Sequence, residues 1–110
     1  MSVLEQGDII EVDFNPSVGH EPAKSRPAIV VTSYAYNARS SLVEVVPIQS
    51  ADTGYPLHVP VHDAGLHGFA CVEQVRTIDL ERREYRLVGY ASDSLMRRIM
   101  GIIRGMFGLR

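Results

Sequence analysis

Hydrophobic and polar residues alternate along the first part of the chain, and this pattern predicts β-strands. Residues 7–14 alternate between apolar and acidic side chains, as expected for a strand with one buried face. Residues 28–32 are apolar on both faces, so this second strand should be central in its sheet. Arg26 and Pro27 open it, and proline at the start of a strand costs little because its missing N–H need not enter the ladder.

The remaining strand-like segments are separated by short polar or glycine-rich stretches, which are typical of turns and loops. They are residues 42–48, 55–61, 69–74 and 85–90. Residues 75–79 either continue the fifth strand or bend away from it. Residues 33–41 predict a turn or a single helical turn.

The hydrophobic period changes near the C-terminus. Ser92 or Asp93 is suited to cap a helix. Apolar residues then recur at steps of three and four, which predicts an amphipathic helix. These residues are Leu95, Met96, Ile99, Ile102, Ile103 and Met106. Many short strands and one terminal helix predict a mainly β fold, a small twisted barrel whose open side the helix covers. Docking of this helix into a partner is the alternative.

The size and composition of the chain fit one domain, residues 1–110,. Its single cysteine, Cys71, cannot form an internal disulfide, which favours a reducing compartment,. No apolar segment is long enough for a membrane span, and the first residues lack the order of a signal peptide. We therefore expect a soluble, cytoplasmic protein.

Charge is distributed unevenly, although the net charge is only −2. Residues 1–23 hold five acidic residues and no Lys or Arg, whereas residues 82–110 hold seven arginines and two acidic residues. Arginine binds phosphate through two hydrogen bonds and stacks on bases. A polyanion can therefore be held locally, with ordinary solvated faces as the alternative.

The loop between the first two strands, residues 15–25, brings several reactive side chains close to Arg26. It holds His20, Glu21 and Lys24. A loop held by a strand at each end is a good position for functional groups. An ordinary solvated hairpin loop is the alternative.

Other chemistries find little support. His58 and His62 are four residues apart in a strand pattern, where they share a face but sit far apart, so no metal site is expected,. Glycine motifs that cradle nucleotide phosphates are absent. Cys71 lies in an apolar strand and should be a small core residue. Glu73 and Arg76 offer a second acid–base pair.

Acid–base chemistry on phosphate therefore remains. His20 is suited to give or take a proton, Glu21 to act as a base or orient one, and Arg26 to stabilise charge on a pentavalent phosphorus. These groups suffice for RNA transesterification. A base takes the proton of a ribose 2′-OH, the oxygen attacks the adjacent phosphorus, and an acid protonates the leaving 5′-oxygen.

Two blocks of sequence form a more specific pattern. The first is Gly7-Asp8-Ile9-Ile10-x-Val12-Asp13-Phe14-Asn15-Pro16-Ser17-x-Gly19-His20-Glu21, followed by Arg26-Pro27-Ala28-Ile29-Val30-Val31. The second is Glu73-Gln74-Val75-Arg76-Thr77-Ile78-Asp79. Shorter matches lie between them: Tyr36-Asn37, Val46-Pro47-Ile48, Gly54-Tyr55-Pro56 and Gly65-Leu66-x-Gly68. Over nearly its whole length, the chain resembles the MazF/PemK/Kid toxin family of type II toxin–antitoxin systems.

This resemblance implies an SH3-like twisted β barrel with a C-terminal helix, forming a homodimer. It implies an endoribonuclease that needs no metal or other cofactor and cuts single-stranded RNA, including mRNA, at short motifs. The products would carry a 2′,3′-cyclic phosphate and a 5′-hydroxyl. A cognate antitoxin would block the RNA groove with an extended tail.

The resemblance also assigns roles to residues. Arg26 would act as an acid or stabilise the transition state, and His20 and Glu21 would bind or activate RNA. Glu73 stands where Kid-like members carry a catalytic aspartate, and Ser50 is a further catalytic candidate. The residues expected to contact RNA are Gly19, Lys24, Gln49 and Arg76.

Two positions depart from the family pattern. Gln49 stands where MazF-like members carry a catalytic threonine, and an amide cannot carry a proton. Either Ser50 substitutes after a small shift, or Gln49 only binds phosphate. Cys71 stands where Kid-like members carry an arginine. These departures leave two alternatives open: a gyrase-binding toxin resembling CcdB on the same barrel, and a catalytically silent relative that only binds RNA or antitoxin.

Overall fold

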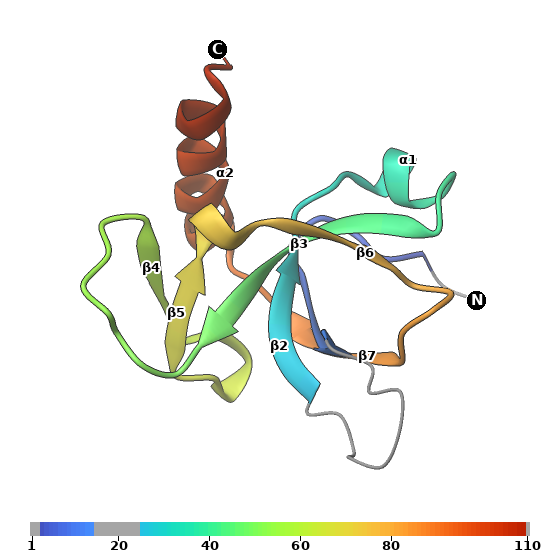
Figure 1. Ribbon diagram of the computed structural model, residues 1–110, viewed down its shortest axis with the longest axis horizontal. Coiled ribbons are helices and arrows are strands. Elements are labelled where there is room, and N and C mark those ends of the chain that lie inside the picture. Colours follow the sequence, from blue (N-terminus) through green and yellow to red (C-terminus); the bar gives the residue numbers. More distant parts are fainter. Residues whose placement is uncertain (1–2, 15–24, 110) are drawn as a thin grey trace.

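The computed structural model describes residues 3–14 and 25–109 (Figure 1). The strands are β1 (Asp8–Asp13), β2 (Ser25–Val30), β3 (Leu42–Gln49), β4 (His58–Val61), β5 (Gly68–Cys71), β6 (Arg76–Asp79) and β7 (Tyr85–Tyr90). The helices are α1 (Tyr34–Asn37) and α2 (Asp93–Phe107), and two 3-10 turns are η1 (Asp63–Gly65) and η2 (Val72–Gln74). The predicted mainly β fold with a C-terminal helix is thus confirmed.

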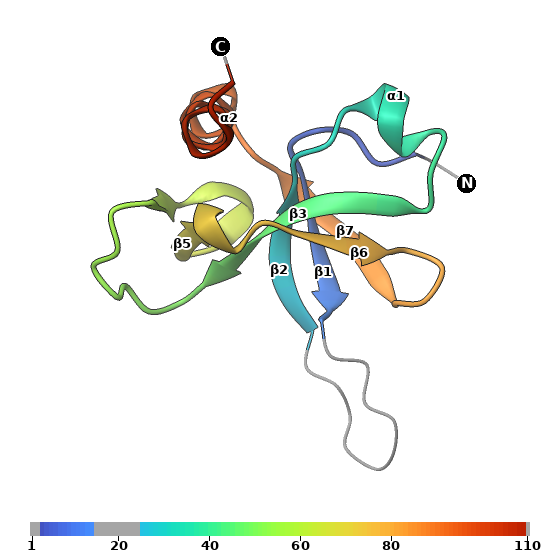
Figure 2. The ribbon, with the colours of Figure 1, turned by 45° about the horizontal axis from the view of Figure 1, so that its top comes forward.

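The strands form one twisted antiparallel sheet, in the order β4-β5-β3-β2-β1-β7, with β6 also paired to β3 (Figures 1 and 2). Among the described residues no pairing joins β4 to β7. The sheet is therefore barrel-like but remains open. β2 lies between β1 and β3, which confirms its predicted central place.

The central strands are buried on both faces, which confirms the prediction for β2, whereas the pattern of β1 predicts only one buried face. Ile9 of β1 and Ile29 of β2 belong to a core cluster on one side of the sheet, together with Ile99 of α2. Ile10 and Val30, their neighbours in sequence, belong to a second cluster on the opposite side. Successive strand residues point to opposite faces, so each strand contributes to both cores.

Helix α2 covers the first of these clusters, beside β4 and η2 (Figure 2). The Ser92 hydroxyl accepts a hydrogen bond from the Leu95 N–H and caps the first turn,. Gly108 ends the helix with a φ of 67°, which favours glycine,. The predicted cap and covering role are confirmed. Neither helix of the described segments is long and apolar enough to cross a membrane.

Strand β3 pairs with two strands in succession along one edge. Its first half pairs with β6, where Leu42 faces Asp79, and its end pairs with β5, where Gln49 faces Phe69. Both partners run antiparallel to β3, and η2 takes up the residues between them. The predicted fifth strand over residues 69–74 is therefore too long, and residues 75–79 bend away.

The predicted fourth strand, residues 55–61, also begins too early. The structure starts β4 at His58, because the His58 N–H donates to the Tyr55 carbonyl at 3.1 Å and closes a turn. This turn and η2 both lie near the end of β3, where the candidate site is found.

Candidate active site

Arg26 and Gln49 lie opposite each other where β2 begins and β3 ends. The register pairs Ala28 with Pro47, and two further residues outward on each strand bring Arg26 level with Gln49 on the same face. Both residues line two hollows of about 460 and 410 Å³. Those volumes fall in the range of small-ligand sites, so this end of the sheet is the candidate site.

The first hollow adds groups that can transfer protons. Ser50 and His67 line it together with Arg26. The His67 ring lies against that of His62, with the ring centroids 5.8 Å apart. A hydroxyl and an imidazole beside a guanidinium provide an acid or base next to an anion-binding group.

The second hollow adds positive charge. Arg76 lines it with Arg26, and its guanidinium carbon lies 4.9 Å from the centre of the Phe14 ring. None of the described residues that line either hollow is acidic. Two guanidinium groups, with no carboxylate among the described lining residues, favour a phosphate or another anion,.

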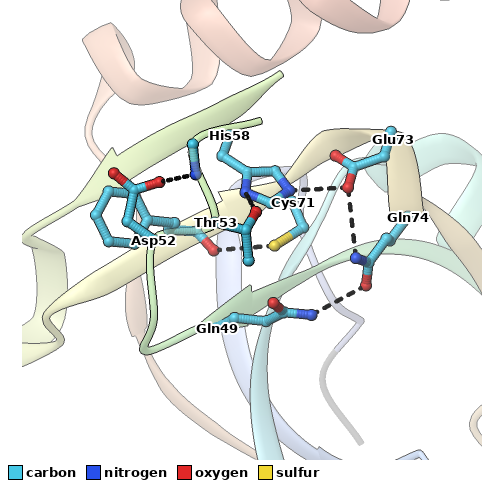
Figure 3. A network of polar contacts seen from close by, with 9 residues as sticks. Gln49, Asp52, Thr53, His58, Cys71, Glu73 and Gln74 are labelled. Carbon is cyan, nitrogen blue, oxygen red and sulfur yellow. Dashed lines mark hydrogen bonds and ion pairs between the residues drawn. The ribbon is translucent and has the colours of Figure 1, made fainter. Parts of the chain in front are cut away.

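A chain of hydrogen bonds runs from Gln49 into the protein (Figure 3). Gln49 Nε2 donates to Gln74 Oε1 at 3.2 Å, and Gln74 Nε2 donates to Glu73 Oε2 at 3.4 Å. The same Glu73 oxygen lies 2.8 Å from His58 Nε2. His58 Nδ1 lies 3.3 Å from the Thr53 hydroxyl. A polar network from β3, β4 and η2 therefore ends at the candidate site.

Glu73 pairs with His58 and not with Arg76. The His58 side chain is 4% exposed and that of Glu73 is 24% exposed, so the pair is largely removed from water. Arg76 contacts the Phe14 ring instead. The two residues of the predicted second acid–base pair therefore make different contacts, because η2 turns Glu73 toward β4 while Arg76 already belongs to β6.

Cys71 is a core residue, as its apolar surroundings in the sequence predict. It is buried in β5, and its thiol donates to the Phe69 carbonyl at 3.5 Å. Burial, and then the nearby Glu73 charge, raise the pKa of the Cys71 thiol, against a smaller lowering by the Gln49 backbone,. The thiol is accordingly unsuited to act as a nucleophile.

The structure brings several predicted site residues together. Arg26, Gln49, Ser50 and Arg76 surround the two hollows. Glu73 lies behind them and reaches the site through Gln74. The remaining predicted residues lie outside the described part of the chain: Gly19, His20, Glu21 and Lys24.

Sequence reasoning missed three residues of this site: His67, His58 and Gln74. His67 occupies the unspecified position of Gly65-Leu66-x-Gly68, so the motif contained no signal for it. His58 was considered only as a metal ligand. Its partner lies 15 residues away in sequence, and only the β4–β5 pairing brings the two together.

Within residues 3–14 and 25–109, no cluster of three or more His, Cys, Asp or Glu side chains is arranged to hold a metal ion. His58 is engaged by Glu73 and Thr53. The functional groups that line the candidate site are two guanidinium groups, a hydroxyl, an imidazole and two amides.

Comparisons with known proteins show which family and which proteins the chain resembles. The family described as "PemK-like, MazF-like toxin of type II toxin-antitoxin system" matches residues 5–107. The endoribonuclease toxin MazF of Escherichia coli K12 is 31% identical over 106 residues, covering 96% of both chains. The endoribonuclease toxin ChpB of the same organism is 33% identical over 101 residues, covering 86% of both.

The fold is also similar to solved structures. A crystal structure of MazF from Deinococcus radiodurans superposes with a TM-score of 0.84 at 27% identity. The match covers 99% of this chain and 100% of that one. The sheet and the C-terminal helix are thus shared over the full length of both proteins.

Proposed function

The chain belongs to the PemK-like, MazF-like toxins of type II toxin–antitoxin systems, and from this premise we propose that it is an endoribonuclease that cleaves single-stranded RNA without a metal. Similar proteins named endoribonucleases match nearly its whole length. The observation that supports the proposal best is the meeting of two hollows at Arg26 and Gln49, with Arg76 as a second cation. Such a site suits a phosphodiester.

The proposed reaction is an internal transesterification. A base removes the proton of the 2′-OH, and the oxygen attacks the adjacent phosphorus. The bond from phosphorus to the 5′-oxygen then breaks, and an acid protonates the leaving oxygen. The products are a 2′,3′-cyclic phosphate and a 5′-hydroxyl, so no water or cofactor is consumed.

Arg26 is the residue on which the proposal chiefly depends. Arg26 lines both hollows, and its guanidinium is suited to stabilise the negative charge that builds on the pentavalent phosphorus. Ser50 and His67 line the first hollow beside it and are the described residues suited to carry the protons,. Gln49 has no proton to transfer and is assigned to binding.

Other roles extend the proposal to residues farther from the hollows. Arg76 would bind a neighbouring phosphate of the strand,. Glu73 would support the site through Gln74. The roles expected for His20, Glu21, Gly19 and Lys24 remain part of the same proposal. We further propose that residues 1–110 form one toxin domain, which acts as a cytoplasmic homodimer and is inhibited by a cognate antitoxin.

The test is gel analysis of a mixed-sequence single-stranded RNA incubated with the purified protein and EDTA. We expect discrete cuts whose 5′ fragments end in a cyclic phosphate. Arg26→Ala should lower the rate by about 100-fold or more, the scale of losing one transition-state donor. Arg98→Ala, an exposed arginine of α2 outside both hollows, serves as the matched control.

The alternative functions predict other results. Absence of cuts by the unmodified protein would contradict the proposed activity. Gyrase trapping would then support a CcdB-like toxin, whereas RNA or antitoxin binding without cleavage would support a silent relative. Cleavage that Arg26→Ala leaves at the parent rate would remove Arg26 from the mechanism.

A further inference from the structure

The hydrogen bonds behind Gln49 have a defined direction, because an ionised carboxylate lies at their inner end. Glu73 Oε2 can only accept. His58 Nε2 must therefore carry the hydrogen at 2.8 Å, and Gln74 must turn its NH₂ group toward Glu73 at 3.4 Å. An amide alone has no preferred orientation, but this one is set by the carboxylate.

The orientation of the Gln74 amide also fixes which end of the Gln49 amide faces the candidate site. With its NH₂ turned inward, Gln74 offers its carbonyl oxygen to Gln49, and Gln49 Nε2 donates one of its two hydrogens to it at 3.2 Å,. This contact turns the NH₂ group of Gln49 toward Gln74 and leaves its carbonyl oxygen as the acceptor for a ligand. Gln49 lines both hollows beside Arg26, so an acceptor lies next to the proposed phosphate-binding group.

We infer that Glu73 and His58 are positioning residues that fix the Gln49 amide so that its carbonyl oxygen accepts a hydrogen bond from the 2′-OH of the RNA. This inference rests on the proposed function. The 2′-OH is favoured over a base amino group because it lies on the ribose next to the scissile phosphate, which Arg26 would hold. Gln49 would thus recognise ribose in the place where related toxins carry a hydroxyl.

The arrangement tolerates either protonation state of His58. The Thr53 hydroxyl, 3.3 Å from Nδ1, donates to a neutral ring and accepts from a protonated one. In both states Nε2 keeps its hydrogen for Glu73. The orientation of the Gln49 amide therefore depends on the charge of Glu73 and not on that of His58.

The test uses two oligonucleotides that cannot be cut because they lack a leaving group. Once cleavage sites are mapped, a synthetic oligoribonucleotide that ends at one site with a 3′-phosphate is compared with its analogue carrying 2′-deoxyribose at the terminal nucleotide. The unmodified protein should bind the ribose form roughly fivefold more tightly, the scale of one hydrogen bond. Gln49→Leu, which removes the acceptor, should abolish that preference.

The positioning role predicts a second pattern. Glu73→Leu should also abolish the preference, because it leaves Gln74 without the acceptor that sets its orientation. Glu73→Asp keeps a carboxylate and should retain the preference, at least in part. Arg98→Ala should leave it unchanged. Circular dichroism checks that Glu73→Leu folds, and Gln49→Leu, at a half-buried position, tests the inference even if it does not.

The outcomes separate the two proposals. No cleavage of RNA by the unmodified protein would overturn the proposed function and this inference with it. Cleavage, with a ribose preference that persists in Gln49→Leu, would overturn the inference alone. An equal loss of affinity for both oligonucleotides in Gln49→Leu would place another RNA donor, such as a base amino group, on the carbonyl and would also contradict it.

Discussion

His58 Nε2 lies 2.8 Å from Glu73 Oε2, although 15 residues separate them in sequence. β4 presents the histidine and η2 presents the glutamate. The pair is mostly shielded from water, and the second carboxylate oxygen, Oε1, is buried with no hydrogen-bond partner among the described residues. Glu73 therefore depends on His58 as its main donor.

Replacing His58 should therefore lower the stability of the folded protein. We expect His58→Leu to lower the free energy of unfolding by about 1–3 kcal/mol, because a partly buried carboxylate loses its donor. Urea denaturation measures the change. The double variant with Glu73→Leu should lose less than the sum of the two single variants. Additive losses would mean that the two side chains do not stabilise each other.

The first hollow leads to a prediction about proton transfer. If His67 carries a proton in cleavage, His67→Gln should lower kcat by about 10²- to 10⁴-fold. His62→Gln is the matched control, since His62 touches the His67 ring but does not line the hollow.

Ser50 provides the competing assignment. An unchanged kcat in His67→Gln, together with a large loss in Ser50→Ala, would assign the proton to the hydroxyl. Loss in both variants would indicate that the two groups act on different protons of the same reaction. Equal effects of His67→Gln and His62→Gln would contradict a specific role for His67.

The Cys71 thiol should react slowly with alkylating reagents in the folded protein. Because burial raises the pKa of its thiol, alkylation by iodoacetamide at pH 7–8 should be much slower in the folded protein than after unfolding. Cys71→Ser should leave cleavage nearly unchanged, while the buried hydroxyl lowers stability by about 1–2 kcal/mol. A large loss of cleavage with intact folding would place the thiol in the site.

The same shift predicts how stability depends on pH. The folded thiol ionises at higher pH than the unfolded thiol, whose ordinary pKa is about 9.0. The contribution of the protonated Cys71 thiol to the free energy of unfolding is complete below about pH 9. It is lost as the pH rises through the pKa of the thiol in the folded protein. Denaturation midpoints of the parent should therefore fall more steeply above pH 9 than those of Cys71→Ala.

Much of the fold could be predicted because its signals are local. The apolar strand at Ile29 and Val30 identified a central strand, and the spacing of Leu95 and Ile99 identified a covering helix. The break at residues 72–74 could not be predicted, since Val72 and Val75 continue an apolar pattern. Only the need of β3 to pair with both β5 and β6 explains it.

The candidate site was predictable only in part, for a similar reason. Family motifs mark Arg26 and Glu73, but neither motif says what each side chain touches. The nearness of Arg26 to Gln49 follows from the β2–β3 register, and the Glu73–His58 contact from the β4–β5 register. Such long-range pairings are not visible in local sequence patterns.

Gly68 allows β5 to approach β3 closely at the site. A Cβ atom at this position would lie 2.5 Å from the backbone oxygen of Gln49, so Gly68→Ala must push the two strands apart. We expect a loss of about 1–3 kcal/mol in stability. Cleavage should also fall in the folded fraction, because Gln49 would move relative to Arg26.

A second glycine provides the matched control. Gly101 lies on the exposed side of α2, and nothing lies within 4 Å of a Cβ added there. Gly101→Ala should therefore raise stability by about 0.5–1 kcal/mol through helix propensity and leave cleavage unchanged. Thermal and urea unfolding, with cleavage assays well below the midpoint, measure both variants. A Gly68→Ala protein as stable and active as the parent would show that β5 is free to shift away from Gln49 without disturbing the site.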